Sequence, residues 1–286
     1  MKTIYNPFSL RNNHSLTTFE TVGQFMEFLG TANTYDQKNI SGPFFSNETF
    51  SSVAFKAVNG DKEASERADK LLAAIETGTM TTTKTKRVNS YKGRPSVARY
   101  LSGNPKACKS TVKLATPLAP ITVVVSLNSM ASVETTALER RGVAIAALVK
   151  KLSRTRTVTL YLSRFSSCPP ANDSAMLVKF PTAPLDSYRL AFLLSNQGFC
   201  RGAGFIFHGN TDLITGGKKG RLQHCSFAGG NGYSQSRHCQ YATDLTAHFG
   251  TQVFYIEGSD PANSSFKQLQ ADPVAWVNDT VKSLSN

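Results

Sequence analysis

One stretch of the chain, residues 121–153, limits the fold more than any other. It opens with ITVVVSLN, a continuous run rich in β-branched residues, as expected of a strand buried on both faces. The next segment, VETTALERRGVAIAALVKKL, has the period of an amphipathic helix of about five turns. A buried strand followed by such a helix predicts an α/β domain with a covered sheet.

Strand-like segments alternate with helix-like segments through the rest of the chain. This alternation implies crossover connections and a mainly parallel sheet with helices on both faces. We therefore expect a three-layer α/β core over residues 115–286. The expected strands are 156–165, 175–180, 201–208 and 252–258, and the expected helices are 186–196 and 272–284.

The N-terminal part, residues 1–114, is expected to form a helical extension with a basic loop. Apolar residues at helical spacing predict a helix over 15–29, with Ser15 or Thr17 as its cap. Good helix formers predict another helix over 60–78. We expect a loop with a short strand over 39–55. Residues 79–95 have no hydrophobic period and are expected to be an exposed loop.

Positive charge is concentrated in the middle of the chain. The formal net charge is +13 and the sequence pI is about 9.6. Residues 77–240 hold 23 Lys or Arg against five acids, which gives +18, while the two ends together sum to −5. Such an excess of positive charge indicates the kind of partner rather than the fold, and it favours a nucleic-acid partner.

The 57 residues between Glu76 and Glu134 contain no acid at all. Cations in this segment can meet phosphates without internal competition, and interleaved tyrosines can stack on unpaired bases. This combination predicts contacts to single-stranded nucleic acid, whereas a solvated surface loop without a partner is the alternative. The candidate contact residues are Lys84, Lys86, Arg87, Tyr91, Lys92, Arg94, Arg99, Tyr100, Lys106 and Lys109.

A second basic group lies in a glycine-rich loop over residues 209–240. Its glycines would let backbone N–H groups approach phosphates closely, although an ordinary flexible loop explains the composition equally well. The candidate residues in this loop are Lys218, Lys219, Arg221, Tyr233 and Arg237.

Searches for enzyme chemistry give no complete site. The Gly216–Lys219 segment lacks the Ser/Thr of a phosphate-binding loop, and the His224–Cys225 and His238–Cys239 pairs lack zinc-finger spacing. The basic region has almost no carboxylates to hold catalytic magnesium. We therefore expect a non-enzymatic protein with no metal and no cofactor.

The cellular location is expected to be a cytoplasm. The sequence contains no apolar run of membrane-spanning length, and its N-terminus lacks the apolar stretch of a secretory signal. Five widely spread cysteines without a C-x-x-C pair suit reduced thiols better than a disulfide framework. No membrane partner is expected.

Two resemblances add to this interpretation. The order VVVSLNSMAS, ALERRGVAIAALVKKL and TVTLYLSRF resembles the opening β-α-β unit of a von Willebrand factor A-type domain. That family places an Asp-x-Ser-x-Ser metal site after its first strand. Here Ser126, Asn128 and Met130 occupy those positions, so the resemblance implies the fold with a degenerate metal site.

The segment NSYKGRPSVARYLSGNPKAC, combined with this α/β half, resembles the single-stranded-DNA-binding RNA polymerase cofactors (Drc-type) of lytic podoviruses. The resemblance implies that the chain captures melted DNA and brings a phage RNA polymerase to it in the host cytoplasm. The residues it assigns to DNA are those already singled out by charge: Lys84, Lys86, Arg87, Arg94 and Arg99.

The sequence thus favours a non-enzymatic single-stranded DNA-binding protein that serves phage transcription or replication. The alternative is an A-type interaction module or a virion structural protein without specific nucleic-acid binding. RNA binding stays open because stacking and phosphate contacts serve both polymers. A homo-oligomer is compatible with either interpretation.

Overall fold

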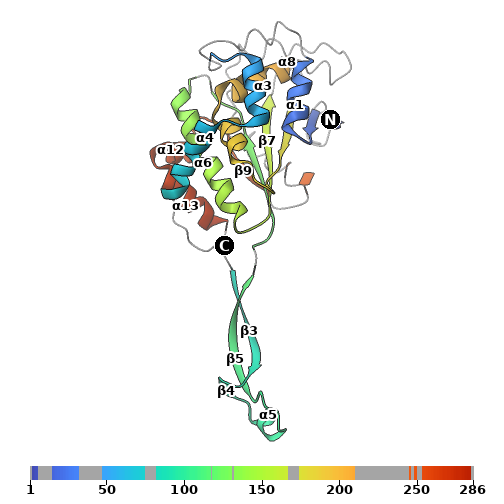
Figure 1. Cartoon of the computed structure of the whole chain (residues 1–286), viewed down its shortest axis with the longest axis vertical. Helices are drawn as coiled ribbons and strands as arrows, with labels where there is room; N and C mark the ends of the chain where they lie inside the picture. Colours follow the sequence, from blue (N-terminus) through green and yellow to red (C-terminus); the bar gives the residue numbers. More distant parts are fainter. Residues whose placement is uncertain are drawn as a thin grey trace.

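The computed structural model describes residues 2–5, 15–31, 47–74, 82–116, 118–130, 132–166, 174–209, 245, 248–249 and 253–284. These residues form a mixed α/β body and a long, narrow hairpin that projects from it (Figure 1). The hairpin contains all the Lys and Arg residues of the acid-free segment, and the body contains the apolar core.

A six-stranded sheet forms the centre of the body. Its strand order is β1-β2-β8-β7-β6-β9. Three of the five neighbouring pairs are parallel, namely β2–β8, β6–β7 and β6–β9, so the expected mainly parallel sheet is confirmed. The bounds are β1 Lys2–Tyr5, β2 Ser15–Phe19, β6 Ile121–Ser126, β7 Val158–Ser166, β8 Ser174–Phe180 and β9 Val253–Ile256.

The unit β6–α6–β7 lies where the sequence predicts it. All six residues of β6 are buried, because a β-branched strand in the middle of the sheet meets apolar neighbours on both faces. The following helix, α6 (Thr135–Ser153), is buried continuously from Arg141 to Val149. It therefore lies between the sheet and an outer group of helices.

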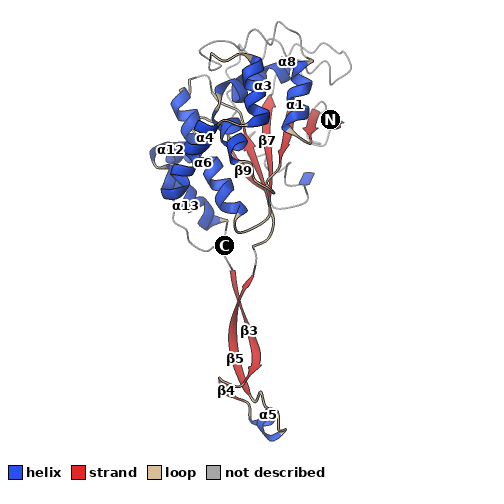
Figure 2. Cartoon of the chain, in the orientation of Figure 1, coloured by secondary structure: helices blue, strands red, loops and turns tan. Residues whose placement is uncertain are grey.

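Helices pack on one another over one face of the sheet (Figure 2). α6 contacts α4, α7, α12 and α13, and one continuous apolar cluster joins these helices to β6, β7 and β8. The bounds of the helices in this layer are α1 Val22–Gly30, α3 Phe50–Asn59, α4 Lys62–Ala74, α7 Ser187–Ser195, the π-helical turn η2 Gly198–Ala203, α8 Gly204–Gly209, α12 Ser264–Ala271 and α13 Pro273–Ser283.

The opposite face of the sheet is also apolar. Val124 and Leu177 point into a second, smaller cluster there, which includes Leu245. The rings of Tyr161 and Phe249 lie 4.7 Å apart between centroids on this side. Apolar side chains therefore pack on both faces of the sheet, which agrees with the α/β expectation.

Four local expectations are wrong. Residues 15–19 form β2, and the first helix begins at Val22, with the Thr21 side chain accepting from the backbone N–H of Gln24. Residues 50–59 are helical, capped by Thr49. Residues 201–208 lie in η2 and α8 rather than in a strand. Residues 82–90 form a strand rather than a loop.

The N-terminal part shares the sheet with the C-terminal part. β2 pairs in parallel with β8, and α3 and α4 pack against α7. The division expected between residues 114 and 115 falls near the end of the hairpin, whose last strand ends at Thr116.

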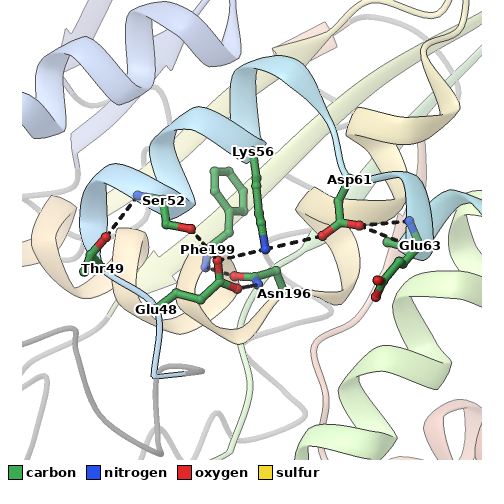
Figure 3. A network of polar contacts seen from close by, with 9 residues as sticks. Glu48, Thr49, Ser52, Lys56, Asp61, Glu63, Asn196 and Phe199 are labelled. Carbon is green, nitrogen blue, oxygen red and sulfur yellow. Dashed lines mark hydrogen bonds and ion pairs between the residues drawn. The ribbon is translucent and has the colours of Figure 1, made fainter.

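A polar network ties the start of α3 to the layer formed by α7 and η2 (Figure 3). Ser52 Oγ and Asn196 Nδ2 each donate to the carboxylate of Glu48 at 2.8 Å. Lys56 Nζ lies 3.1 Å from Glu48 Oε2 and 3.5 Å from Asp61 Oδ2. Burial alone would raise the pKa of Glu48, but the contacts from Ser52, Lys56 and Asn196 outweigh it and lower the pKa.

We expect Glu48→Gln to destabilise the fold by about 1 kcal/mol at neutral pH, because an ion pair and two charge-assisted hydrogen bonds are weakened. A carboxylate with a lowered folded-state pKa stabilises above its unfolded pKa, and this contribution is lost as the pH falls through the folded pKa. The difference between wild type and variant should therefore narrow below about pH 4. Urea unfolding at neutral and acidic pH measures it, with Glu66→Gln as an exposed control. A difference independent of pH would contradict the assignment.

Candidate nucleic-acid interface

The part of the acid-free segment that holds its cations folds as a hairpin, called here the arm and defined as residues 82–116. Its two long strands, β3 (Thr82–Ser90) and β5 (Cys108–Thr116), are paired antiparallel along their whole length. A short strand, β4 (Arg94–Pro95), pairs with the other side of β5. The short helix α5 (Val97–Leu101) forms the tip, at the end farthest from the body (Figure 1).

Cations line one face of the arm. Asn89 of β3 lies opposite Lys109 of β5, which in turn lies opposite Arg94 of β4. Residues directly opposite one another share a face, and residues two apart on a strand share it too. Arg87 therefore joins Lys109 and Arg94 on this face, and all three are exposed. Lys113 continues the same face by its register position.

The other face of the arm mixes cations with apolar residues. Lys84 and Lys86 occupy register positions opposite Leu114 and Val112, and Val88 follows them along β3. Among the arm side chains that the structure describes, none belongs to an apolar cluster of the body. The two faces therefore offer different chemistry to a partner: one is cationic and polar, and the other is partly apolar.

No carboxylate within the arm competes for these cations. Among the arm side chains that the structure describes, none forms an ion pair, whereas body cations such as Lys150, with Nζ 2.5 Å from Asp69 Oδ1, do. The charge of the arm is consequently directed to solvent, where it can attract a polyanion.

The tip adds exposed aromatic and aliphatic side chains. Tyr91 is 69% exposed, Tyr100 is 75% exposed, and Val97 and Leu101 are exposed to a similar degree. The Lys106 ammonium lies 5.6 Å from the centroid of the Tyr91 ring, within cation–π range. Such exposed rings beside cations suit stacking of unpaired bases next to phosphates.

Gly93 allows the chain to return beside β5. Its φ of +127° is a conformation that side chains rarely adopt, and a Cβ at this position would lie 2.4 Å from the carbonyl oxygen of Lys109. Glycine is therefore required for the close approach that places Arg94 next to Lys109.

The structure brings the first predicted group together and leaves the second outside the described residues. Lys84 lies in β3, and Arg99 is half-buried in α5. The exposed members are Lys86, Arg87, Tyr91, Lys92, Arg94, Tyr100, Lys106 and Lys109. Lys218, Lys219, Arg221, Tyr233 and Arg237 lie outside the described residues, as do His224, Cys225, His238 and Cys239. Among the described residues, no group of three or more His, Cys, Asp or Glu is placed to hold a metal.

The positions that the sequence resemblance compares with a metal site lie at the carboxyl end of β6. Ser126 and Asn128 are buried there, with Ser126 Oγ accepting from the backbone N–H of Asn128 at 3.2 Å. Arg141 Nη2 donates to the carbonyl oxygens of Ser126 and Glu257, and so connects the ends of β6 and β9. A guanidinium thus holds these strand ends together, and its charge disfavours a cation at the same place.

Sequence reasoning missed three buried arginines near this strand end. Arg141, Arg164 and Arg201 are each less than 5% exposed. Arg164 donates to the carbonyl of Cys200, and Arg201 donates to the carbonyls of Met130 and Val133. The sequence contains one indication of a buried arginine: Arg141 lies on the apolar face of a helix that is predicted to be buried.

Cys200 lies close to the three arginines. Burial raises the pKa of its thiol to about 11, against the attraction of the surrounding guanidinium groups. At pH 8 only about one molecule in a thousand would carry the thiolate that reacts with alkylating agents. We expect iodoacetamide to leave Cys200 unmodified in the folded protein and to modify it in urea. Mass spectrometry would show this, with half-buried Cys108 of the arm as the comparison. Equal native rates at the two thiols would contradict the prediction.

Comparison with known proteins gives one match. A family model with the description "Domain of unknown function (DUF7192)" covers residues 2–268, which include the arm and the body up to the middle of α12. No curated protein and no solved structure matches the sequence. Over the described residues, every helix is too short or too polar to cross a membrane.

Proposed function

Because the chain belongs to the DUF7192 family, whose description assigns no activity, we propose its function from its own geometry: it is a non-enzymatic protein that binds single-stranded DNA through the arm. The observation that carries this proposal is the row of Arg87, Lys109 and Arg94 on one exposed face of an acid-free hairpin. These side chains can meet successive phosphates without competition from neighbouring carboxylates.

The preference for single strands rests on the tip. Tyr91 and Tyr100 expose most of their surface, and every base has a face on which such rings can stack. Bases in a duplex are already stacked on one another, so the rings would gain less there. Phosphate contacts position the strand without reading its sequence, and we therefore propose binding that depends little on base order.

We further propose that the body serves as a docking module that brings a phage RNA polymerase to the captured strand. The support is the β6–α6–β7 unit, which resembles a von Willebrand A-type opening and has lost the carboxylate of that family's metal site. Without that carboxylate, partner binding would depend on the shape and charge of the body rather than on a shared metal.

The decisive measurement is a salt titration of binding to a short single-stranded oligonucleotide. The logarithm of the association constant should fall linearly with the logarithm of salt concentration, with a slope near −0.7 for each phosphate neutralised. Duplex DNA and RNA of matched sequence, measured side by side, test the polymer and the strandedness. A slope indistinguishable from zero would remove the proposal, and equal affinity for duplex would remove the role given to the tyrosines.

A further inference from the structure

A cleft of about 940 Å³ lies between β9 and the two C-terminal helices, α12 and α13. Six consecutive residues, from Val253 to Gly258, line one side of it. Phe266, Leu269 and Trp276 line the other side and give it an apolar floor. Because alternate residues of a strand point to opposite faces, a lining that includes every residue of β9 indicates that the cleft follows the edge of the strand.

β9 is the last strand of the described sheet on this side. It is hydrogen-bonded to β6, and its residues from Val253 to Tyr255 are only half-buried, unlike the fully buried β6. A strand at the edge of a sheet presents backbone N–H and C=O groups that another extended segment can pair with. Among the residues that the structure describes, no further strand pairs with β9, and the cleft runs along this edge.

The cleft is acidic on a chain that is otherwise strongly basic. Glu257, Asp272 and Asp279 line it, against Arg141 as the one cation of the lining. Arg141 is itself engaged by the carbonyl oxygens of Ser126 and Glu257. An occupant of the cleft is therefore expected to be extended, to match the strand edge, and basic, to match the carboxylates.

We propose that the cleft binds the arm of a second copy of this chain, with β3 added to the edge of β9. β3 is extended, it lies at the edge of the arm's own sheet, and it presents the exposed cations Lys86 and Arg87. Each arm points away from its own body (Figure 1), so a neighbouring copy is the natural recipient. The same cations repel a second arm, which favours pairing with the acid-lined edge over pairing between arms.

Such a contact joins two different surfaces, the arm of one copy and the cleft of the next. A contact of this kind generates a ring or an open chain of copies rather than a closed two-fold dimer. Because β3 would pair through its backbone edge, Lys109 and Arg94, which belong to β5 and β4, stay on an open face. Successive copies would then present their cationic rows to one nucleic-acid strand.

Sedimentation velocity of the full-length, nuclease-treated protein over a wide concentration range tests the proposal. We expect self-association that weakens as salt rises. Asp279→Lys should weaken it at least about tenfold, because a carboxylate facing the arm becomes a cation. Glu27→Lys makes the same charge change at an exposed position of α1 and should leave association unchanged. Neither variant alters the arm, so both should keep oligonucleotide binding.

A charge exchange between copies identifies the occupant. An arm variant with Lys86→Glu and Arg87→Glu should not self-associate, and neither should a cleft variant with Glu257→Lys and Asp279→Lys. Mixing the two should restore association, since the reversed arm matches the reversed cleft. A wild type that stays monomeric, an arm variant that associates like wild type, or a mixture that stays dissociated would each overturn the proposal. These assays contain no nucleic acid, so their outcome is independent of the DNA-binding proposal.

Discussion

Replacing Arg87, Arg94 and Lys109 together by alanine is expected to weaken single-stranded DNA binding roughly 100-fold, at about 1 kcal/mol for each lost phosphate contact. The three side chains share one exposed face of the arm and have no carboxylate neighbours there. The loss should be similar for all base sequences, and the salt slope should become shallower by about 2. Fluorescence anisotropy with labelled oligonucleotides at several salt concentrations measures both quantities.

The matched control removes the same charge from the body. Lys62, Arg67 and Lys70 are exposed on α4, and their replacement by alanine keeps good helix formers in a helix. This triple variant should bind within a few-fold of wild type. If it lost as much affinity as the arm variant, overall charge rather than the arm would govern binding.

Replacing Gly142 by alanine is expected to destabilise the body by about 2 kcal/mol. A Cβ at this position of α6 would lie 2.3 Å from the carbonyl oxygen of Leu194 and 2.6 Å from the Cα of Ser195. Alanine favours an isolated helix by about 1 kcal/mol over glycine, but forcing two packed helices apart costs about 1–3 kcal/mol or more. The clash is with backbone atoms of α7, which cannot rotate away. We therefore expect the cost of separating the helices to exceed the gain in helix propensity.

Gly30→Ala gives the control for this prediction. Gly30 closes α1, and a Cβ there would have no atom within 4 Å. This variant should be neutral or slightly more stable than wild type, because only helix propensity changes. Urea unfolding followed by circular dichroism compares the two variants. Equal stability of Gly142→Ala and wild type would show that α6 and α7 can separate at little cost.

The sequence was sufficient for the elements that combine a strong hydrophobic period with burial. β6, α6, β7, β8, α7, β9 and α13 all lie where their patterns predict them. The sequence did not predict the correct element where burial in the folded protein overrides the local hydrophobic pattern. Residues 201–208 have the apolar content of a strand, but they lie in η2 and α8, which follow α7 after the extended residue Asn196. Short apolar runs of this length do not distinguish a strand from a buried helix.

The sequence predicts that the arm is a binding surface, which stays a prediction, but it does not predict that the arm is a hairpin. Sequence reasoning identifies strands by apolar alternation, which reflects a buried face. The side chains of β3 that the structure describes, from Lys86 to Ser90, belong to no apolar cluster, and the strand shows no apolar period. The register, which places Arg87, Lys109 and Arg94 on one face, arises from strand pairing over about 20 residues of separation. No local pattern records it.

The buried arginines and the cleft could not be predicted from the sequence, because they depend on contacts between distant parts of the chain. Arg141 donates to carbonyls at the ends of two strands that are more than a hundred residues apart in the chain. Such a contact exists only after the sheet has formed. A charged residue within an apolar helix face is the only trace that it leaves in the sequence.

The arm's separation from the body has a practical outcome for genetics and engineering. Residues between Lys86 and Thr111 contribute nothing to the apolar clusters of the body. Substitutions among these arm residues can change which ligand the protein binds while the melting temperature of the body stays constant. Substitutions that alter ligand preference can therefore accumulate in the arm with little effect on the stability of the body. For the same reason, a different hairpin can be grafted onto this body by design.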